Sequence, residues 1–175
     1  MFFKTEHLIV NALTLEDSKR FHEICTQKFV TYWMNDWDMS LKEVETLLEY
    51  FITGYIISDP EKIPYVIAIR YNDILIGICG FGPKEEIDDK IEICYFIDEK
   101  YTKHGYMSEV LPKAIEYYFN MTNRLTLSAL VDEANIPSKN LLIKNGFTFL
   151  KTCNADGKSK SIYCRIKDTL IKGSL

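Results

Sequence analysis

A strand that is apolar on both faces, and that runs into a helix through a glycine-containing loop, most constrains the fold of this chain. In the run of residues 90–97, isoleucine and tyrosine alternate with cysteine and phenylalanine, and Glu92 is the only charge after the first residue. Such a strand lies inside a sheet that is covered on both faces, because a face in contact with water would be polar. Gly105 then precedes an apolar pattern with helical spacing from Met107 to Phe119. These residues predict a central strand, a loop and a helix in direct succession.

Two further helices are predicted near the N-terminus from their starting signals. TLED at Thr14 and SLKE at Ser40 each have the form of a capping box, in which a hydroxyl and an acidic side chain satisfy free amides of the first turn. We expect the first helix to run to about Phe29. The second keeps its apolar residues on one helical face from Leu41 to Tyr55.

The remaining predicted elements are strands and one more helix. The turn sequence YND separates two β-rich runs and predicts a hairpin, whereas Gly146 has the position of a left-handed cap after the helical segment KNLLIK. The strands are expected at residues 7–12, 64–70, 74–80, 90–97, 125–131, 147–151 and 161–166. The order of elements is therefore β-α-α-β-β-β-α-β-α-β-β.

Length and composition favour one domain. The chain has 175 residues, of which 47% are hydrophobic, and it shows no repeat, low-complexity tract or linker, so we expect a single domain over residues 1–175. A net charge of -4 argues against a non-specific nucleic-acid binder. No apolar run approaches the roughly 20 residues of a membrane span. The N-terminus shows no targeting segment, and we expect a cytoplasmic protein.

The cysteines and histidines show no metal or disulfide pattern. None of the five cysteines belongs to a CxxC pair, and three of them lie in apolar runs, where cysteine behaves as a small hydrophobic residue. We therefore expect neither a disulfide framework nor a bound metal.

Gly105 suggests an anion site at the start of the helix that follows it. The amides of a first helical turn have no intrahelical partner and attract phosphate. A glycine lets phosphate oxygens approach because it lacks a Cβ and tolerates a positive φ. Lys103 and His104 add positive or donor character nearby, although Gly105 can instead be a residue that only begins the helix. Neither GxxxxGK[ST] nor GxGxxG is present, so a nucleoside-triphosphatase or dinucleotide-binding fold is not favoured.

Two segments resemble the paired core motifs of the GNAT acyltransferase superfamily, and in particular its branch of ribosomal-protein N-terminal alanine acetyltransferases. They are IEICYFIDEKYTKHGYMSEVL and, further along, ANIPSKNLLIKNGF, and the order of elements agrees from Thr5 to Ile166. The resemblance implies an α/β (α+β) fold with a mixed, mostly antiparallel central sheet and helices on both faces. It also implies an N-acetyltransferase that uses acetyl-CoA as co-substrate and needs no metal.

The resemblance further implies a set of cofactor-binding residues. The loop before the helix would bind the pyrophosphate of acetyl-CoA, and the preceding strand, which splays from its neighbour in this family, would pair with the pantetheine arm. Asn135 and Ser138 match the NxxS that opens the second motif, although each can instead be a plain helix cap. The implied cofactor-binding residues are Phe96, Ile97, Lys103, His104, Gly105, Tyr106, Met107, Ser108, Asn135 and Ser138.

Four positions depart from the family pattern. Lys103 and Met107 stand where relatives usually have a glycine and a small residue, which predicts a bulkier phosphate loop. Pro112 lies inside the helix, where it removes one hydrogen bond and should kink the element. Leu142 occupies the position of a tyrosine that protonates the departing thiolate in many relatives, so the resemblance supplies no general acid.

Glu92 is the candidate general base. An ammonium has no lone pair and must lose a proton before it attacks a thioester. A carboxylate on a mostly apolar strand can have the raised pKa that this step requires. The alternative is an ion pair with Arg70, Arg124 or a lysine across the sheet. Backbone amides near Phe96 or Ile97 would polarise the thioester carbonyl.

The acceptor-binding residues are expected in the segment YWMNDW between the two N-terminal helices. Tyr32, Trp33 and Trp37 would contact a cationic amine through their rings, unless they are ordinary core residues. We expect direct transfer of an acetyl group from acetyl-CoA to a primary amine, either a protein N-terminus or a small amine, in a ternary complex. The alternative is a non-catalytic acyl-CoA-binding sensor or interaction module. The resemblance favours a monomer or homodimer, and we expect no nucleic-acid or membrane partner.

Overall fold

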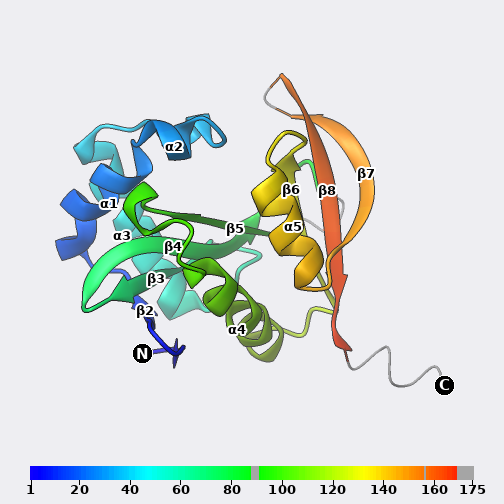
Figure 1. The fold of residues 1–175 in the computed structure, drawn as a ribbon. Coiled ribbons are helices and arrows are strands. Elements are labelled where there is room, and N and C mark those ends of the chain that lie inside the picture. The colour runs from blue at the N-terminus through cyan, green and yellow to red at the C-terminus, as the bar shows by residue number, and fades with distance from the viewer. Residues whose placement is uncertain (88–90, 156, 169–175) are drawn as a thin grey trace.

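An eight-stranded sheet runs through the part of the chain that the computed structural model describes, residues 1–87, 91–155 and 157–168 (Figure 1). The strand order is β1-β2-β3-β4-β5-β6-β8-β7, and every neighbouring pair is antiparallel except β5 and β6. The expected mixed, mostly antiparallel sheet is confirmed. The strands are β1 (Phe3–Lys4), β2 (Ile9–Ala12), β3 (Tyr65–Tyr71), β4 (Ile74–Pro83), β5 (Ile91–Ile97), β6 (Thr126–Asp132), β7 (Thr148–Ala155) and β8 (Lys158–Ile166).

Helices cover both faces of this sheet. They are α1 (Ser18–Cys25), α2 (Lys28–Thr31), α3 (Leu41–Ile57), α4 (Tyr106–Met121) and α5 (Ile136–Lys144), with the 3-10 turns η1 (Leu15–Asp17), η2 (Asn35–Trp37) and η3 (Glu99–Tyr101). None of the helices in the described ranges combines the length and apolar character that crossing a membrane requires.

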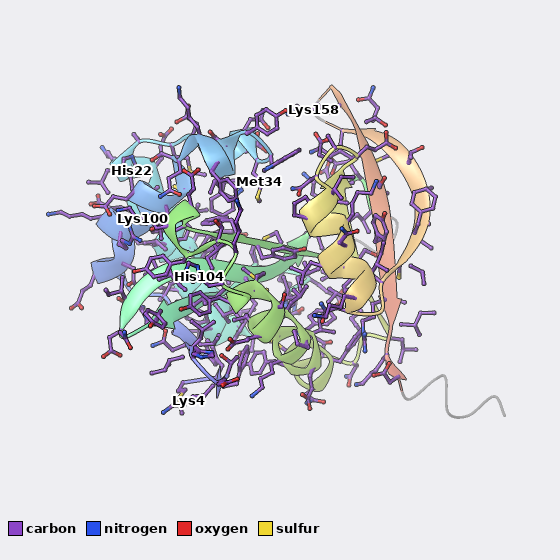
Figure 2. The ribbon with its side chains drawn as sticks, in the orientation of Figure 1. Lys4, His22, Met34, Lys100, His104 and Lys158 are labelled. Carbon is purple, nitrogen blue, oxygen red and sulfur yellow. The ribbon has the colours of Figure 1, made fainter. Side chains whose placement is uncertain are left out.

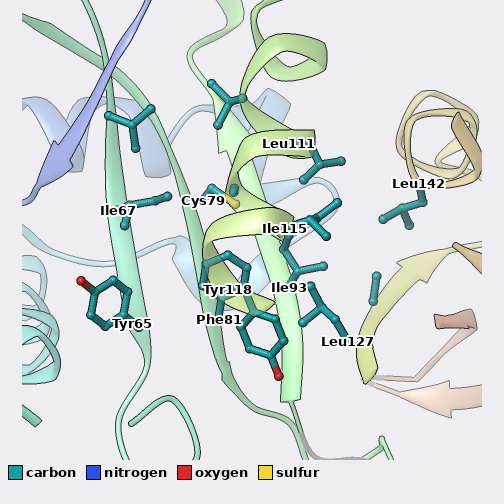
Figure 3. Close-up of a cluster of buried hydrophobic side chains, with 14 of the residues drawn as sticks. Tyr65, Ile67, Cys79, Phe81, Ile93, Leu111, Ile115, Tyr118, Leu127 and Leu142 are labelled. Atoms are coloured by element: carbon teal, nitrogen blue, oxygen red, sulfur yellow. The ribbon is translucent and has the colours of Figure 1, made fainter. Parts of the chain in front are cut away.

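Two layers of buried apolar side chains hold the helices to the sheet. On one face, Leu111 of α4 packs with Ile93 of β5 in a cluster that also includes residues of α5 (Figure 3). On the other face, Phe21 of α1 and Leu48 of α3 pack with Phe96 of β5. Because β5 contributes to both layers, it is the central strand that its two apolar faces predict.

Both capping boxes are present, but the first helix is shorter than expected. Ser40 and Glu43 bond reciprocally at the start of α3, and the Thr14 amide donates to Asp17 at 2.8 Å at the start of η1. The expectation of a continuous helix to about Phe29 is wrong, because α1 ends at Cys25 and α2 is a separate turn.

Gln27 explains this break. Its backbone is extended, with φ −61° and ψ 137°. Its side-chain amide donates to Asp98 at 3.0 Å and accepts from the Glu99 amide at 3.0 Å. These bonds to the far end of β5 turn the chain out of the helix, so the residues after Gln27 lie over the end of β5.

The other differences concern element ends. β1 was not expected, and β7 and β8 form a longer hairpin than the expected strands, closed by Gly157 at φ +70°. Lys90, the expected first residue of the central strand, lies outside the described residues. The helix α4 continues through Pro112, whose side chain is exposed.

The sheet opens between β5 and β6. β4 pairs with β5 along its whole length, whereas the described residues of β5 and β6 pair at one position, Glu92 with Ser128. Beyond that position the strands diverge, as the resemblance implied. The edge of β5 from Ile93 to Ile97 therefore faces a gap in the sheet, with backbone groups that no ladder from β6 satisfies.

Candidate active site

A cavity of about 760 Å³ lies at this opening of the sheet. Its walls come from the segment after α1, from β5 and β6, from the loop before α4 with the first turn of that helix, and from α5, and Lys84 and Lys160 also line it. Figure 2 labels Met34 on the first of these walls and Lys158 at the tip of the β7–β8 hairpin across the opening. The cavity thus joins the candidate cofactor loop, the candidate base and the candidate acceptor segment.

The loop before α4 has the backbone of an anion site. Gly105 is the N-cap of α4 at φ +83°, and no heavy atom lies within 4 Å of the place where a Cβ would stand. No side chain caps the helix, so its first-turn amides face the cavity without a bonded partner from a capping residue. Lys103 also has a positive φ, +62°, although it has a Cβ. Open space and free amides fit a pyrophosphate at this loop.

Asp98 holds the start of that loop in place. Its side chain is 0% exposed and accepts hydrogen bonds from Gln27, Arg20 and the Lys100 amide. Burial alone would raise its pKa, but these bonds outweigh burial and hold the pKa below its usual value. The carboxylate therefore ties α1 and the segment after it to η3, which leads into the cofactor loop.

Most of the implied cofactor residues line the cavity, and one does not. The lining includes Phe96, Ile97, Lys103, Gly105, Tyr106, Met107, Ser108, Asn135 and Ser138. His104 is exposed and lies outside the lining, where its Nδ1 donates to the Thr102 carbonyl at 2.7 Å and its ring stacks on Tyr106.

Asn135 and Ser138 act as a helix cap and also line the cavity. Asn135 Oδ1 accepts from the Ser138 amide at 3.2 Å, which caps α5. The Ser138 hydroxyl lies 2.8 Å from the hydroxyl of Tyr95, a contact that spans the gap between α5 and β5. Leu142, one turn further along α5, also lines the cavity.

Glu92 is partly buried where β5 and β6 are still paired. Its carboxylate accepts from the Leu130 amide at 3.3 Å. Burial raises its pKa to about 7, and nearby Lys84 and Lys160 limit the rise. The arginine alternatives do not apply, because Arg70 pairs with Asp17 and Arg124 with Glu61. Glu92 therefore has the pKa of a group that exchanges protons near neutral pH.

The segment after α1 supplies an aromatic wall. Trp33 and Trp37 line the cavity, together with Asp36, and the Trp37 ring lies 4.9 Å from that of Phe96. Tyr32 lies outside the lining and is 65% exposed, and Lys158 sits over its ring and donates to its carbonyl at 3.2 Å. This contact connects the segment after α1 to the β7–β8 hairpin.

Four residues that line the cavity were not predicted as site residues from the sequence: Tyr95, Lys84, Lys160 and Tyr101. The only signal for Tyr95 was its position, since it replaces isoleucine in the alternation of the central strand three residues after Glu92. Lys84 and Lys160 lie far apart in the sequence and belong to no sequence motif that indicates a site.

Comparison with known proteins shows the class of protein to which this fold belongs. The acetyltransferase (GNAT) domain family matches residues 7–148. The chain therefore belongs to the GNAT acetyltransferase family and is an N-acetyltransferase of that family, whose members use acetyl-CoA.

Individual relatives agree with this assignment. The uncharacterized N-acetyltransferase p20 of Bacillus licheniformis is 26% identical over 152 residues, which cover 84% of this chain and 81% of that protein. RimL, a ribosomal L7/L12 alpha-N-protein acetyltransferase solved with coenzyme A, has a TM-score of 0.80 at 17% identity, covering 94% of this chain and 96% of that one. AAC(6')-Ib, solved with paromomycin and acetyl-CoA, has a TM-score of 0.75 at 12% identity, covering 97% and 99%.

Proposed function

We propose that this chain, as a single domain over residues 1–175, transfers an acetyl group from acetyl-CoA directly to a primary amine in a ternary complex. The observation that carries the proposal is that Glu92, the Gly105 loop and the segment 33–37 all open onto one cavity. A direct transfer needs both substrates in one space with a proton acceptor beside them.

Three groups of residues would hold acetyl-CoA. The first-turn amides after Gly105 would bind the pyrophosphate, with Lys103 adding positive charge. The open edge of β5 at Phe96 and Ile97 would pair with the amides of the pantetheine arm. Asn135 and Ser138 would border that arm from α5. Acetyl-CoA supplies an activated thioester, since a thiol of pKa about 8.5 is a moderate leaving group.

Glu92 would remove the proton that the acceptor amine must lose. At its raised pKa of about 7, a large share of the carboxylate is ionised at neutral pH and still basic enough to accept a proton, directly or through a water. A backbone amide at the open edge of β5 would stabilise the negative charge that develops on the carbonyl oxygen.

The acceptor would lie against the wall of Trp33 and Trp37. Two aromatic rings and Asp36 suit a cationic amine through cation-π contacts and charge. RimL acts on a protein N-terminus according to its name, and AAC(6')-Ib was solved with paromomycin. A protein N-terminus or a small amine is therefore the acceptor class we propose, in a monomer or homodimer. No observation favours the non-catalytic sensor.

The first test is a calorimetric titration with acetyl-CoA and with desulfo-CoA. We expect micromolar binding of both, because the phosphate loop and not the thioester provides most of the contacts. Gly105→Glu should abolish binding, since it places a carboxylate where the phosphates would lie.

Gly157→Glu is the matched control for that variant. Gly157 also has a positive φ, +70°, and a Cβ added there would likewise meet no heavy atom within 4 Å, but the residue does not line the cavity. The control variant should bind acetyl-CoA like the unmodified protein. Equal losses in both variants, or no binding to the unmodified protein at millimolar ligand, would refute the proposed cofactor site. A panel of N-terminal peptides and small amines then identifies the acceptor by CoA release.

A further inference from the structure

Tyr95 is a polar residue in the cavity that the proposed roles leave unused. Along β5, Glu92 and Phe96 belong to the face that carries the acceptor wall, because Phe96 contacts Trp37. Tyr95 belongs to the opposite face, where its ring packs beside the α4 cluster and its hydroxyl reaches Ser138 on α5 at 2.8 Å. A thioester lying along the open edge of β5 would therefore have Glu92 on its acceptor side and Tyr95 on its other side.

The contact with Ser138 places the Tyr95 hydroxyl beside the face of α5 that lines the cavity. Ser138 and Leu142 are four residues apart on α5 and both line the cavity, so they lie on one face of the helix. The family resemblance places Leu142 where many relatives carry a tyrosine, and a leucine side chain has no proton to give. Tyr95 brings a phenol to the same face of α5 from the opposite wall.

We infer that Tyr95 donates its hydroxyl proton to the sulfur of the departing coenzyme A, an inference that rests on the proposed function. As the carbon–sulfur bond of the thioester breaks, its electron pair goes to sulfur, and the Oη proton of Tyr95 goes to the same atom. Ser138 donates a hydrogen bond to the tyrosine oxygen, and solvent water returns the proton. The acceptor ammonium loses two protons in all: Glu92 takes the one that is lost before attack and passes it to solvent, and the one that is lost as the amide forms also goes to solvent. Because solvent returns one proton to Tyr95, the reaction releases one proton overall.

The surroundings of Tyr95 keep its hydroxyl protonated, as a proton donor must be. Burial raises the pKa of the Tyr95 phenol, so it stays protonated across the neutral range. The bond to Ser138 acts in the other direction and lowers the pKa. With Ser138 donating, the Tyr95 proton is free to point into the cavity.

The thiol pKa of bound CoA provides a test that needs no acceptor. The ultraviolet absorbance of the thiolate is titrated with pH in the complex of the protein with CoA. A donor at the sulfur stabilises the thiolate, so Tyr95→Phe should raise the pKa of the bound thiol by about one unit, the size expected for a charge-assisted hydrogen bond. Site-specific 3-fluorotyrosine at this position, a stronger acid of nearly the same shape, should lower it.

Tyr117→Phe is the matched control. Tyr117 makes a comparable bond, 2.9 Å to the hydroxyl of Tyr65, but lies outside the cavity lining, so its loss should leave the thiol pKa unchanged. In turnover with an amine from the panel, Tyr95→Phe should lower kcat by about 10²-fold with little change in KM for acetyl-CoA.

The outcomes separate this inference from the proposed function. If the unmodified protein does not bind CoA, the proposed function fails. If CoA binds and its thiol titrates identically in the unmodified protein, in the fluorotyrosine protein and in Tyr95→Phe, Tyr95 does not touch the sulfur and the inference is overturned. The fluorotyrosine protein decides the question even if Tyr95→Phe fails to fold.

Discussion

At the scale of single residues, Glu92 combines the position and the pKa that proton transfer requires. It lies at the one described position where β5 and β6 are paired, so its carboxylate sits where the sheet begins to open. Sequence reasoning could find it, because a lone charge in an apolar strand is visible in the alternation. The role proposed for Tyr95 could not be predicted in this way. It depends on the hydroxyl of Ser138, which lies 2.8 Å from the Tyr95 hydroxyl in the fold but far from it in the sequence.

The raised pKa of Glu92 predicts the pH dependence of the enzyme. The carboxylate must be ionised to accept a proton, so kcat/KM should rise with pH and level off above about 7. Glu92→Gln should lower kcat by about 10²-fold or more and remove this limb, while acetyl-CoA affinity stays unchanged in calorimetry. If kcat/KM of the variant still rose with pH in the same way, the rise would belong to the ionisation of another group.

The same shift predicts a stability effect that does not depend on activity. Burial raises the folded-state pKa from its ordinary value of 4.5 to about 7, so between these values the folded protein holds a proton that the unfolded chain has released. The free energy of unfolding should therefore fall as pH rises through this window. Urea denaturation should show this fall in the unmodified protein and a smaller one in Glu92→Gln. A parallel pH dependence in both would show that Glu92 is not responsible.

At the scale of elements, local signals predicted where helices and strands begin, and tertiary contacts decided where some of them end. The capping box at Ser40 and the cap at Gly146, with φ +78°, follow from short segments of sequence. The break at Gln27 does not, because its partners Asp98 and Glu99 are far away in the chain. The full length of β7 and β8 likewise depends on pairing along the hairpin, because the residues beyond the expected strands, 152–155 and 158–160, are mostly polar.

Pro112 lies inside α4, where a proline ordinarily destabilises a helix. It cannot donate to the Ser108 carbonyl, and it is exposed, so it fills no space in the core. Pro112→Ala should therefore raise the free energy of unfolding by about 1 to 3 kcal/mol, measured by urea denaturation. An unchanged or lower stability would mean that the helix is already shaped around the proline. Glu116→Ala, at another exposed position of the same helix, is the control.

At the scale of the molecule, the cavity lies where two parts of one sheet are least connected. The family resemblance predicted the order of strands and their divergence, but the aromatic wall and the lysines beside Glu92 required the complete fold. A ligand along the edge of β5 would contact both parts at once. Acetyl-CoA at about 100 times its Kd should therefore raise the free energy of unfolding by about 2.7 kcal/mol, read as a shift in Tm. Gly105→Glu should show no shift, and an equal shift in that variant would place the ligand elsewhere.

The side chain of Gln27 has a consequence for how the two substrates affect each other. The hydrogen bonds of its side-chain amide join two parts of the site. One is the turn that leads into the cofactor loop, and the other is the segment that carries Trp33 and Trp37. We expect a displacement of that turn by acetyl-CoA to move the acceptor wall, which would link the affinities of the two substrates thermodynamically. Such linkage is reciprocal, so an acceptor that binds more tightly after acetyl-CoA must tighten acetyl-CoA binding by the same factor.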